Sequence, residues 1–472
     1  MTDPWSETDR WASRRRPFER AELRLIELAH EDLDPEGRGR LEALRYALNF
    51  AKLLKVQNVD GDDVDLEGVL GPHAERLLAS MVPALLKASR IEDALSLASE
   101  VLPATCRARA SVLEHLPLDR ESLELEVTTR HLAVASGGGG GAGYVYPGAY
   151  DLMERIGLTP SLMVGTSMGA LLSMFRCKAP RFDLAALVAA ARVLSWSRVF
   201  RVLETGNRYG LPAALRLYLR AALGDLFRID GRSMQLSDMA IPMYSVVTGI
   251  TVDALKHDLD YYEHLLDQEV ASMGSLNAST AIKTFGIFRE FYASRQALRR
   301  VVLGRDEGTE HFDTLDAAGF SAAIPGVIHY DVMRDDPRMR KILDELYERH
   351  GISRLGEGGM VSNLPARVAW ESVVSGRFGR RNVAVVALDC FAPSLKRLPW
   401  YAFMQAVRQA NVVGDLAFAD LYVPLHQTLS PLNLVPSTTD ALQAIRWGRT
   451  AMTPHLDQLA ELCRPLDVLP EE

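Results

Sequence analysis

Apolar residues in the first quarter of the chain recur every three to four positions, the spacing of one face of an α-helix. Leu41, Leu44 and Leu48 follow this spacing, and residues 74–88 and 91–102 repeat it. The pattern predicts an α-helical N-terminal region over residues 1–122.

Farther along, the apolar residues form short continuous runs separated by stretches of helical periodicity. Such runs are typical of strands that are buried on both faces of a parallel sheet. The sequence therefore predicts an α/β fold over residues 123–395, with a mainly parallel central sheet flanked by helices. The expected strands are 132–136, 161–164, 243–248 and 382–388.

Mostly helical sequence surrounds the strand expected at 243–248. Apolar stripes occur in residues 211–223 and 261–292, with charged residues between the apolar ones of the second stretch. Residues 396–472 form a mostly helical C-terminal extension that includes the turn-rich stretch LSPLNLVPST.

The second expected strand runs into a G-x-S-x-G corner formed by residues 165–169, with Ser167 at its centre. Small residues at Gly165 and Gly169 allow a sharp turn from strand to helix, which leaves the serine strained and its oxygen exposed at the sheet edge. The helix expected from Met168 points the positive end of its dipole at this corner. Ser167 is therefore a candidate nucleophile.

The first expected strand ends in a glycine-rich turn, residues 137–143. Backbone N–H groups there are almost unshielded by side chains, which suits an oxyanion formed by attack on an ester. Gly138, Gly140 and Gly143 also fit the dinucleotide-binding fingerprint G-x-G-x-x-G. However, no Asp or Glu closes the second strand, so the acid that would bind a ribose is missing.

The glycine turn and the serine corner together resemble the motifs of patatin-like phospholipases, G-G-G-x-[R/K]-G followed by G-x-S-x-G. That family carries a later D-G-[GA] motif, for which this chain has Glu357, Gly358 and Gly359 within GEGGMVSNLP. Residues 321–326 and the stretch IPMYSVVTGI also resemble family sequences. The resemblance covers approximately residues 132–388.

The resemblance implies a patatin-like fold and acyl transfer to Ser167, with Glu357 as general base in a Ser-carboxylate dyad. No histidine, metal ion or other cofactor takes part in that chemistry. Residues 180–310 would supply a helical cap beside the acyl groove. Further site residues that the resemblance implies are Gly138, Gly139, Gly140 and Gly143 in the oxyanion hole, Gly165 and Gly169 at the nucleophile elbow, and Gly358 and Gly359 in the dyad loop.

Five consecutive glycines allow the register of the oxyanion loop to slide by one residue. We place the glycine triad at 138–140 because Gly143 then takes the last family glycine. In this register Ala142 stands where the family has Arg or Lys. Glu357 replaces Asp, and its extra methylene shifts the carboxylate by about 1 Å unless the side chain folds back, a displacement that can cost about a hundredfold in rate.

Two other functions remain open at this point. In an α/β-hydrolase, Ser167 and Glu357 would be joined by a histidine such as His426 or His455. There the oxyanion loop follows a strand two before the nucleophile strand, whereas only one helix separates the two motifs here. The other alternative is a non-catalytic lipid-binding or scaffold protein of the same fold.

The net charge of the chain limits the classes of molecule that we expect it to bind. The net charge of −8 argues against nucleic-acid binding. We expect an acyl lipid substrate and peripheral contact with a membrane surface, where Trp400 and Tyr401 could form an aromatic pair. The sequence leaves the oligomeric state open.

The four cysteines are scattered and contain no C-x-x-C pair, and the histidines show no metal-ligand spacing. This pattern favours free thiols in a reducing compartment and no metal site. The N-terminal stretch lacks the apolar core of a signal peptide, and no apolar run is long enough to cross a membrane. We therefore expect a cytoplasmic protein.

Overall fold

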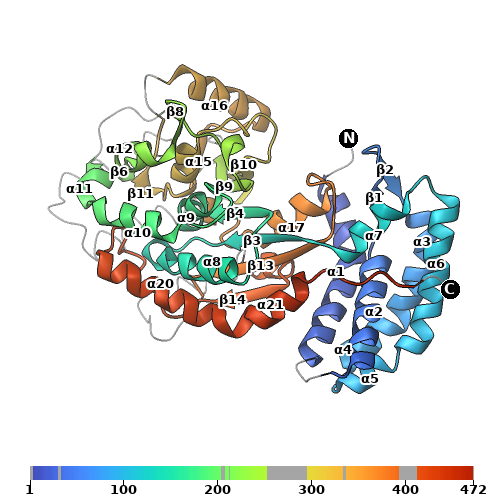
Figure 1. Ribbon diagram of the computed structural model, residues 1–472. Helices are drawn as coiled ribbons and strands as arrows, with labels where there is room; N and C mark the ends of the chain where they lie inside the picture. Colours follow the sequence, from blue (N-terminus) through green and yellow to red (C-terminus); the bar gives the residue numbers. More distant parts are fainter. Residues whose placement is uncertain are drawn as a thin grey trace.

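A computed structural model describes residues 4–29, 33–202, 208–211, 213–251, 295–332, 336–392 and 412–470. Figure 1 shows the central sheet between the N-terminal helices on the right and a group of short helices and strands on the left. The expected helical stripe at 261–292 and the aromatic pair Trp400 and Tyr401 lie outside the described residues.

The N-terminal region is helical, as the apolar spacing predicts. Asp34 caps the second helix by accepting a hydrogen bond from Gly37 N–H, and Asp119 caps the last one in the same way through Ser122 N–H. A short hairpin interrupts the helices, and residues 58–62, which include Asp60 and Asp62, form its turn. The elements are α1 (Pro4–Leu28), α2 (Pro35–Ala51), β1 (Lys55–Gln57), β2 (Asp63–Asp65), α3 (Glu67–Ala79), α4 (Met81–Lys87), α5 (Ile91–Leu95), α6 (Ala98–His115) and α7 (Arg120–Thr128).

The central sheet is mainly parallel, and all four expected strands are present. Strands β14, β13, β3, β4 and β9 run parallel in that order, and β10 and β12 pair antiparallel with β9. The strands are β3 (His131–Ser136), β4 (Leu162–Thr166), β9 (Met243–Ile250), β10 (Leu298–Leu303), β12 (Arg354–Gly356), β13 (Val383–Asp389) and β14 (Leu421–Pro424).

Helices cover both faces of the sheet, which explains why its strands are apolar throughout. Leu132 and Val134 face a core shared with α8, α9, α15 and α20, whereas Ala133 and Ala135 face a core shared with α17. The helices that flank the sheet or follow its strands are α8 (Tyr146–Arg155), α9 (Met168–Cys177), α15 (Thr314–Ser321), α16 (Pro337–His350), α17 (Ala366–Val374), α19 (Val413–Leu416), α20 (Thr438–Met452) and α21 (Leu456–Cys463).

The described part of the 180–310 region is not mostly helical, contrary to the sequence expectation. A small sheet lies here, in which β6 pairs with β5 and β11, and β6 occupies part of the stripe 211–223. Ala213 and Leu217 in β6 are buried, and the pairing of β6 with β5 on one side and β11 on the other makes this segment a strand. The elements are α10 (Leu184–Val193), α11 (Trp196–Val199), β5 (Phe200–Val202), β6 (Ala213–Leu217), α12 (Leu219–Leu223), β7 (Arg228–Ile229), β8 (Arg232–Ser233) and β11 (Gly326–His329).

The C-terminal extension is integrated with the rest of the protein. Its strand β14 extends the central sheet, and α20 crosses α8 in close contact. A Cβ atom at Gly148 would lie 2.1 Å from the carbonyl oxygen of Ile445, and one at Gly448 would lie 1.9 Å from that of Val145. Glycine at both positions therefore permits this helix crossing.

A buried network of charges joins the N-terminal helices to the beginning of β3 and β13. Glu22 accepts hydrogen bonds from Arg45 at 3.0 Å and from Arg130 at 2.7 Å, and Lys52 donates to Asn382 at 2.8 Å. Burial raises the pKa of Glu22, but the charges of Arg130, Arg45 and Lys52 outweigh it and lower the pKa to about 2. Glu22 is therefore ionised and paired.

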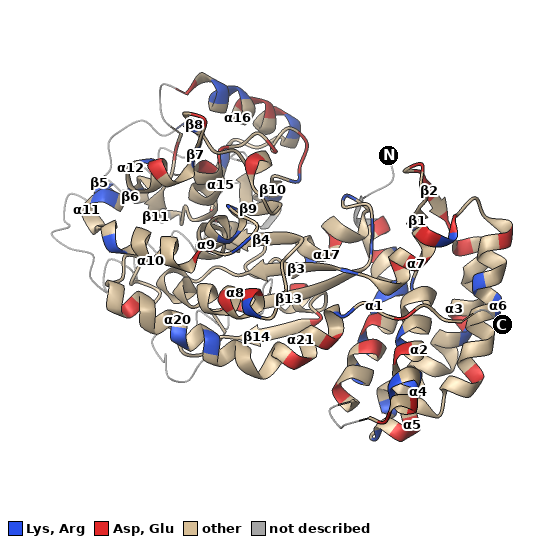
Figure 2. Ribbon diagram, in the orientation of Figure 1, with Lys and Arg blue, Asp and Glu red and all other residues tan. Residues whose placement is uncertain are grey.

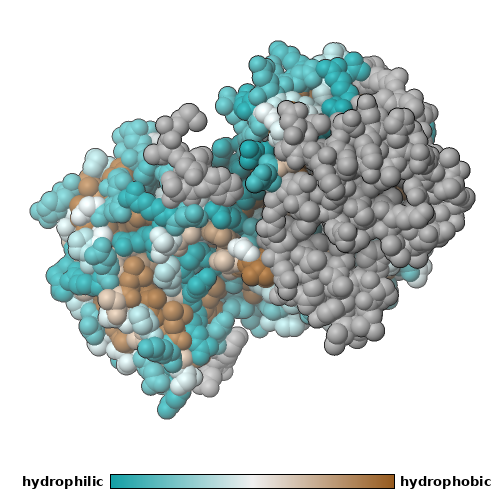
Figure 3. Space-filling model, turned by 180° about the vertical axis from the view of Figure 1, so that it is seen from behind, coloured by the Kyte–Doolittle hydropathy of each residue, from teal (hydrophilic) through white to brown (hydrophobic). Residues whose placement is uncertain are grey.

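The N-terminal helical region occupies the left part of the view from behind in Figure 3. Its surface there includes apolar areas between hydrophilic side chains. Among the helices of the described ranges, none has both the length and the apolar content that crossing a lipid bilayer requires.

Candidate active site

Ser167 lies at the sharp turn between β4 and α9, and its backbone has the positive φ of 54° that marks strain in a residue other than glycine. A Cβ atom at Gly165 would lie 2.5 Å from the backbone of Ala170, and one at Gly169 would lie 2.0 Å from the carbonyl oxygen of Ser136. The two glycines of the G-x-S-x-G corner are thus required by close packing around the serine.

Ser321, at the end of α15, holds the strained turn from the other side. The backbone N–H of Ser167 donates to the Ser321 hydroxyl oxygen at 2.8 Å, and that hydroxyl donates to the carbonyl oxygen of Val246 at 2.6 Å. The hydroxyl therefore links the turn at Ser167 to β9. The sequence resemblance includes Ser321 but does not reveal this contact.

Glu357 follows β12 and begins a short 3₁₀ turn, Gly358–Met360. Its side chain folds back over this turn, because Oε2 accepts a hydrogen bond of 2.7 Å from the backbone N–H of Gly359. Its own N–H donates to Ala323, and Thr248 donates to its carbonyl oxygen. Contacts on both sides of the residue thus fix the loop.

The carboxyl group of Glu357 has a pKa of about 7, well above its usual range. Burial causes this increase, and hydrogen bonds from the Ser167 hydroxyl and the Gly359 N–H oppose it. A carboxyl group with this pKa can both accept and return a proton near neutral pH.

Gly138 lies where these residues meet. A Cβ atom here would lie 2.7 Å from Asn363 Oδ1, 3.1 Å from Ser167 Cβ and 3.5 Å from Glu357 Oε1. The structure therefore brings the first, second and third sequence motifs together at one point.

The glycine loop differs in one respect from the expected arrangement of oxyanion donors. The N–H of Gly138 donates to the carbonyl oxygen of Asn363 at 2.9 Å, which engages it in holding the loop. The N–H groups of Gly139 and Gly140 make no hydrogen bond within the described ranges of the chain. Gly143 lies within the 3₁₀ helix Gly140–Val145, where a Cβ atom would lie 2.6 Å from Met168 Cγ.

The loop after β14 packs directly on the glycine loop, a contact that the sequence interpretation missed. Gly141 N–H donates to the carbonyl oxygen of Pro431 at 2.9 Å, and the Tyr144 hydroxyl donates to that of Leu434 at 3.0 Å. Gly140 has a φ of 54°, and a Cβ atom there would lie 2.3 Å from the Pro431 oxygen. The sequence showed only that LSPLNLVPST is rich in turn residues, and it gave no sign that this stretch lies beside the glycine loop.

Asp415 is a second buried carboxyl group near the dyad loop that the sequence interpretation did not identify. The Ser362 hydroxyl donates to it, and the Thr166 hydroxyl donates to the Ser362 carbonyl oxygen at 2.8 Å. Burial raises the pKa of Asp415 to about 7, against the opposing hydrogen bond from Ser362 and the charge of Arg300. This chain of contacts connects the corner at residues 165–169 to α19.

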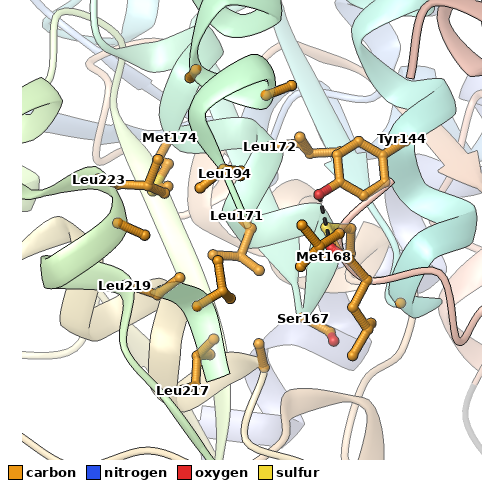
Figure 4. A pocket seen from close by; sticks show the side chains of 18 of the residues that line it. Tyr144, Ser167, Met168, Leu171, Leu172, Met174, Leu194, Leu217, Leu219 and Leu223 are labelled. Atoms are coloured by element: carbon orange, nitrogen blue, oxygen red, sulfur yellow. Dashed lines mark hydrogen bonds between the residues drawn. The ribbon is translucent and has the colours of Figure 1, made fainter. Parts of the chain in front are cut away.

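An apolar cavity opens beside Ser167. Figure 4 shows Ser167 at its edge, with Leu171, Leu194, Leu219 and Leu223 spread along the walls away from the hydroxyl. Leu171 comes from α9, and the other three leucines come from the 184–223 segment. The cavity suits a hydrocarbon chain attached to a carbonyl at Ser167.

Two histidines of the α/β-hydrolase alternative and Ala142 of the glycine loop remain from the sequence predictions. His426 is exposed in the loop after β14, and His455 lies in a 3₁₀ turn, Thr453–His455, after α20. Ala142 is fully buried in the core beneath the glycine loop. In the described ranges, no group of three or more His, Cys, Asp or Glu side chains is arranged to hold a metal ion.

Comparison with protein families agrees with this geometry. A family model for patatin-like phospholipase matches residues 134–370, which is half of the chain. The chain belongs to the patatin-like phospholipase family. A comparison with curated proteins gives no match. Family membership implies lipid acyl hydrolase activity, and it supports the fold predicted from the sequence.

Proposed function

We propose that this patatin-like protein hydrolyses carboxylic esters of phospholipids or related acyl lipids through an acyl-Ser167 intermediate. The observation that carries the proposal is the meeting of Ser167 and Glu357 at Gly138, where a Cβ atom would lie 3.1 Å from Ser167 Cβ and 3.5 Å from Glu357 Oε1. An apolar cavity begins at the same serine.

In the first step, the Ser167 oxygen attacks the ester carbonyl while Glu357 accepts the hydroxyl proton. Glu357 then returns the proton to the departing alcohol, and the acyl group remains on the serine. Glu357 next takes a proton from water, whose oxygen attacks the acyl carbonyl. Release of the fatty acid returns the proton to Ser167, so the dyad is regenerated.

The negative oxygen that forms in each tetrahedral intermediate needs hydrogen-bond donors. We assign this role to the backbone N–H groups of Gly139 and Gly140, because Gly138 N–H is bound to Asn363. One such donor contributes on the order of 3 kcal/mol. The contribution of Gly138 is the absence of a side chain, which lets Ser167 and Glu357 approach.

We also propose that residues 123–395 act as the catalytic unit, with residues 1–122 as a helical region before it. Strand β14 and the loop at Pro431 attach the 396–472 extension to this unit. The substrate would approach from a membrane surface that the protein contacts peripherally.

A fluorophosphonate probe tests the proposed nucleophile. We expect the probe to label the wild-type protein and to leave Ser167→Ala unlabelled, while Ser173→Ala, a control at a buried serine in α9, stays labelled. A folded wild-type protein that takes no label would contradict the proposal and support the non-catalytic lipid-binding alternative.

Separate His426→Ala and His455→Ala variants test the α/β-hydrolase alternative. The dyad proposal expects both variants to keep their ester hydrolysis. Loss of activity in either folded variant would favour a triad that uses that histidine.

A further inference from the structure

Residues 192–198 comprise the end of α10, the two-residue connection and most of α11, and they expose apolar and basic side chains. Every residue of this segment except the half-buried Leu194 is exposed. Val193 is 55% exposed and Trp196 is 43% exposed, and they lie between Arg192 and Arg198. Two exposed apolar side chains within four residues, flanked by arginines, are the feature from which the inference starts.

This segment lies at the cavity beside Ser167. Leu194 lines the cavity, as do Val199 and Phe200 directly after the segment. The Trp196 ring packs on Phe200 with 4.6 Å between ring centroids. Leu434 also lines the cavity, and Leu432, two residues before it in the sequence, is 58% exposed. The exposed apolar side chains thus belong to the elements that form the cavity walls.

The charge of this region is opposite to that of the whole chain. Residues 178–223 contain eight Lys or Arg and two Asp or Glu, whereas the chain has a net charge of −8. Figure 2 shows the basic residues on the ribbon near α11 and β5. Among the residues that the structure describes, no acidic partner pairs with Arg192 or Arg198 within ion-pair distance. Their charges are therefore available to an anionic partner.

We propose that residues 192–198 dock on an anionic lipid surface and hold the cavity at that surface. Tryptophan favours the boundary between lipid headgroups and hydrocarbon, and arginines beside it attract anionic headgroups. Val193 and Trp196 would enter the boundary while Arg192 and Arg198 contact the headgroups. The inference rests on the proposed function, because it states from which side the lipid ester reaches Ser167.

Vesicle binding tests the proposal directly. Phosphatidylcholine vesicles with and without phosphatidylglycerol are sedimented with the wild-type protein and with an R192E/R198E double variant. We expect wild-type binding to require phosphatidylglycerol and the double variant to bind about tenfold more weakly or worse. The matched control is R20E/R107E, which reverses two exposed arginines on α1 and α6 and should bind as the wild type does.

Trp196 provides a second readout of the same contact. We expect tryptophan emission of the wild-type protein to shift to shorter wavelength when the anionic vesicles are added, and Trp196→Phe to lose most of this shift. Equal vesicle binding by R192E/R198E and wild type would overturn the proposal. So would a self-associated form, detected by sedimentation velocity, that is lost in Trp196→Phe while vesicle binding stays unchanged.

Two activity measurements separate this inference from the proposed function. The double variant should hydrolyse a soluble short-chain ester at the wild-type rate and vesicle phospholipid about tenfold more slowly. Ser167→Ala should bind vesicles as the wild type does. A wild-type protein that binds vesicles through the two arginines but cleaves neither ester would refute the proposed function and leave the docking surface standing.

Discussion

Buried carboxyl groups at the two ends of the central sheet differ in pKa by several units. Glu357 lies at the carboxyl ends of the parallel strands, and burial raises its pKa to about 7. Glu22 packs near the opposite ends, and the charges of Arg130, Arg45 and Lys52 overcome burial and lower its pKa to about 2. Both side chains are almost fully removed from solvent.

The difference lies in the partners of the two groups. The groups that favour the ionised form of Glu357, from Ser167 and Gly359, are neutral. They lower its pKa less than burial raises it. Cationic partners surround Glu22, so it stays charged and joins two parts of the molecule. A buried carboxyl group without a cation is suited to transfer protons, and one with cations is suited to hold structure.

The largest expected effect comes from removing the carboxyl group at the catalytic end. We expect Glu357→Gln to lower kcat for a soluble ester by about 10²–10⁴-fold, because the serine loses its proton acceptor. Glu357→Asp should exceed the glutamine variant by at least about tenfold, since a shorter side chain still supplies a carboxylate. Equal rates for Glu357→Gln and wild type in steady-state assays would remove Glu357 from the mechanism.

A glutamine substitution at Glu22, near the opposite end of the sheet, should lower the free energy of unfolding and leave the rate of ester hydrolysis unchanged. Glu22→Gln leaves two buried arginines without their shared anion, so we expect unfolding in urea to show a loss of about 3–5 kcal/mol. Its kcat should stay close to wild type wherever the protein is folded. Glu27→Gln, which removes an exposed ion pair with Arg24, is the control and should cost less than about 1 kcal/mol.

Ser321→Ala should have a smaller effect on the nucleophile turn. The variant leaves the buried N–H of Ser167 without its acceptor, which costs about 1–3 kcal/mol. We expect kcat to fall by about tenfold or more, with little change in KM, and fluorophosphonate labelling to slow in parallel. Ser321→Thr restores the hydroxyl and should recover most of the rate, an outcome that a general packing defect would not produce.

The pH dependence of activity should show a smaller effect of the difference between the two carboxyl groups. The activity of the wild type should rise as pH increases through about 7, since Glu357 must lose its proton to act as a base. Asp415→Asn should keep this rise, although the pKa of Asp415 is also raised to about 7. A profile that is flat between pH 5 and 8, measured as kcat/KM on a soluble ester, would contradict the assignment.

The two ends should also affect stability over different pH ranges. Burial holds a proton on Glu357 in the folded state, so its ionisation reduces stability as pH rises from about 4.5 to 7. The pairing of Glu22 is fully present above its usual pKa of about 4.5, and its contribution is lost as pH falls toward 2. The free energy of unfolding of each variant, subtracted from that of the wild type at each pH, should show these opposite slopes for Glu357→Gln and Glu22→Gln.

Local patterns in the sequence predicted much of the central sheet. The four main strands are buried on both faces, so continuous apolar runs marked them clearly. The prediction was wrong for β6, where a short strand in a small sheet resembled part of a helical stripe. It also gave no hint that β14 extends the central sheet, because pairing between distant segments leaves no local pattern.

The sequence by itself determined the motifs whose function is local. The turn at Ser167 needs glycine at 165 and 169, two residues to either side of the serine. Glu357 caps the next turn by accepting a hydrogen bond from the N–H of Gly359. Only the tertiary structure decided which groups meet. It engages Gly138 N–H with Asn363 and sets the Pro431 carbonyl against Gly140. Among the described residues it gives Glu357 no cationic partner, whereas it surrounds Glu22 with three. The physical reason is that burial and charge pairing depend on neighbours in space, which parallel strand pairing brings from distant parts of the chain.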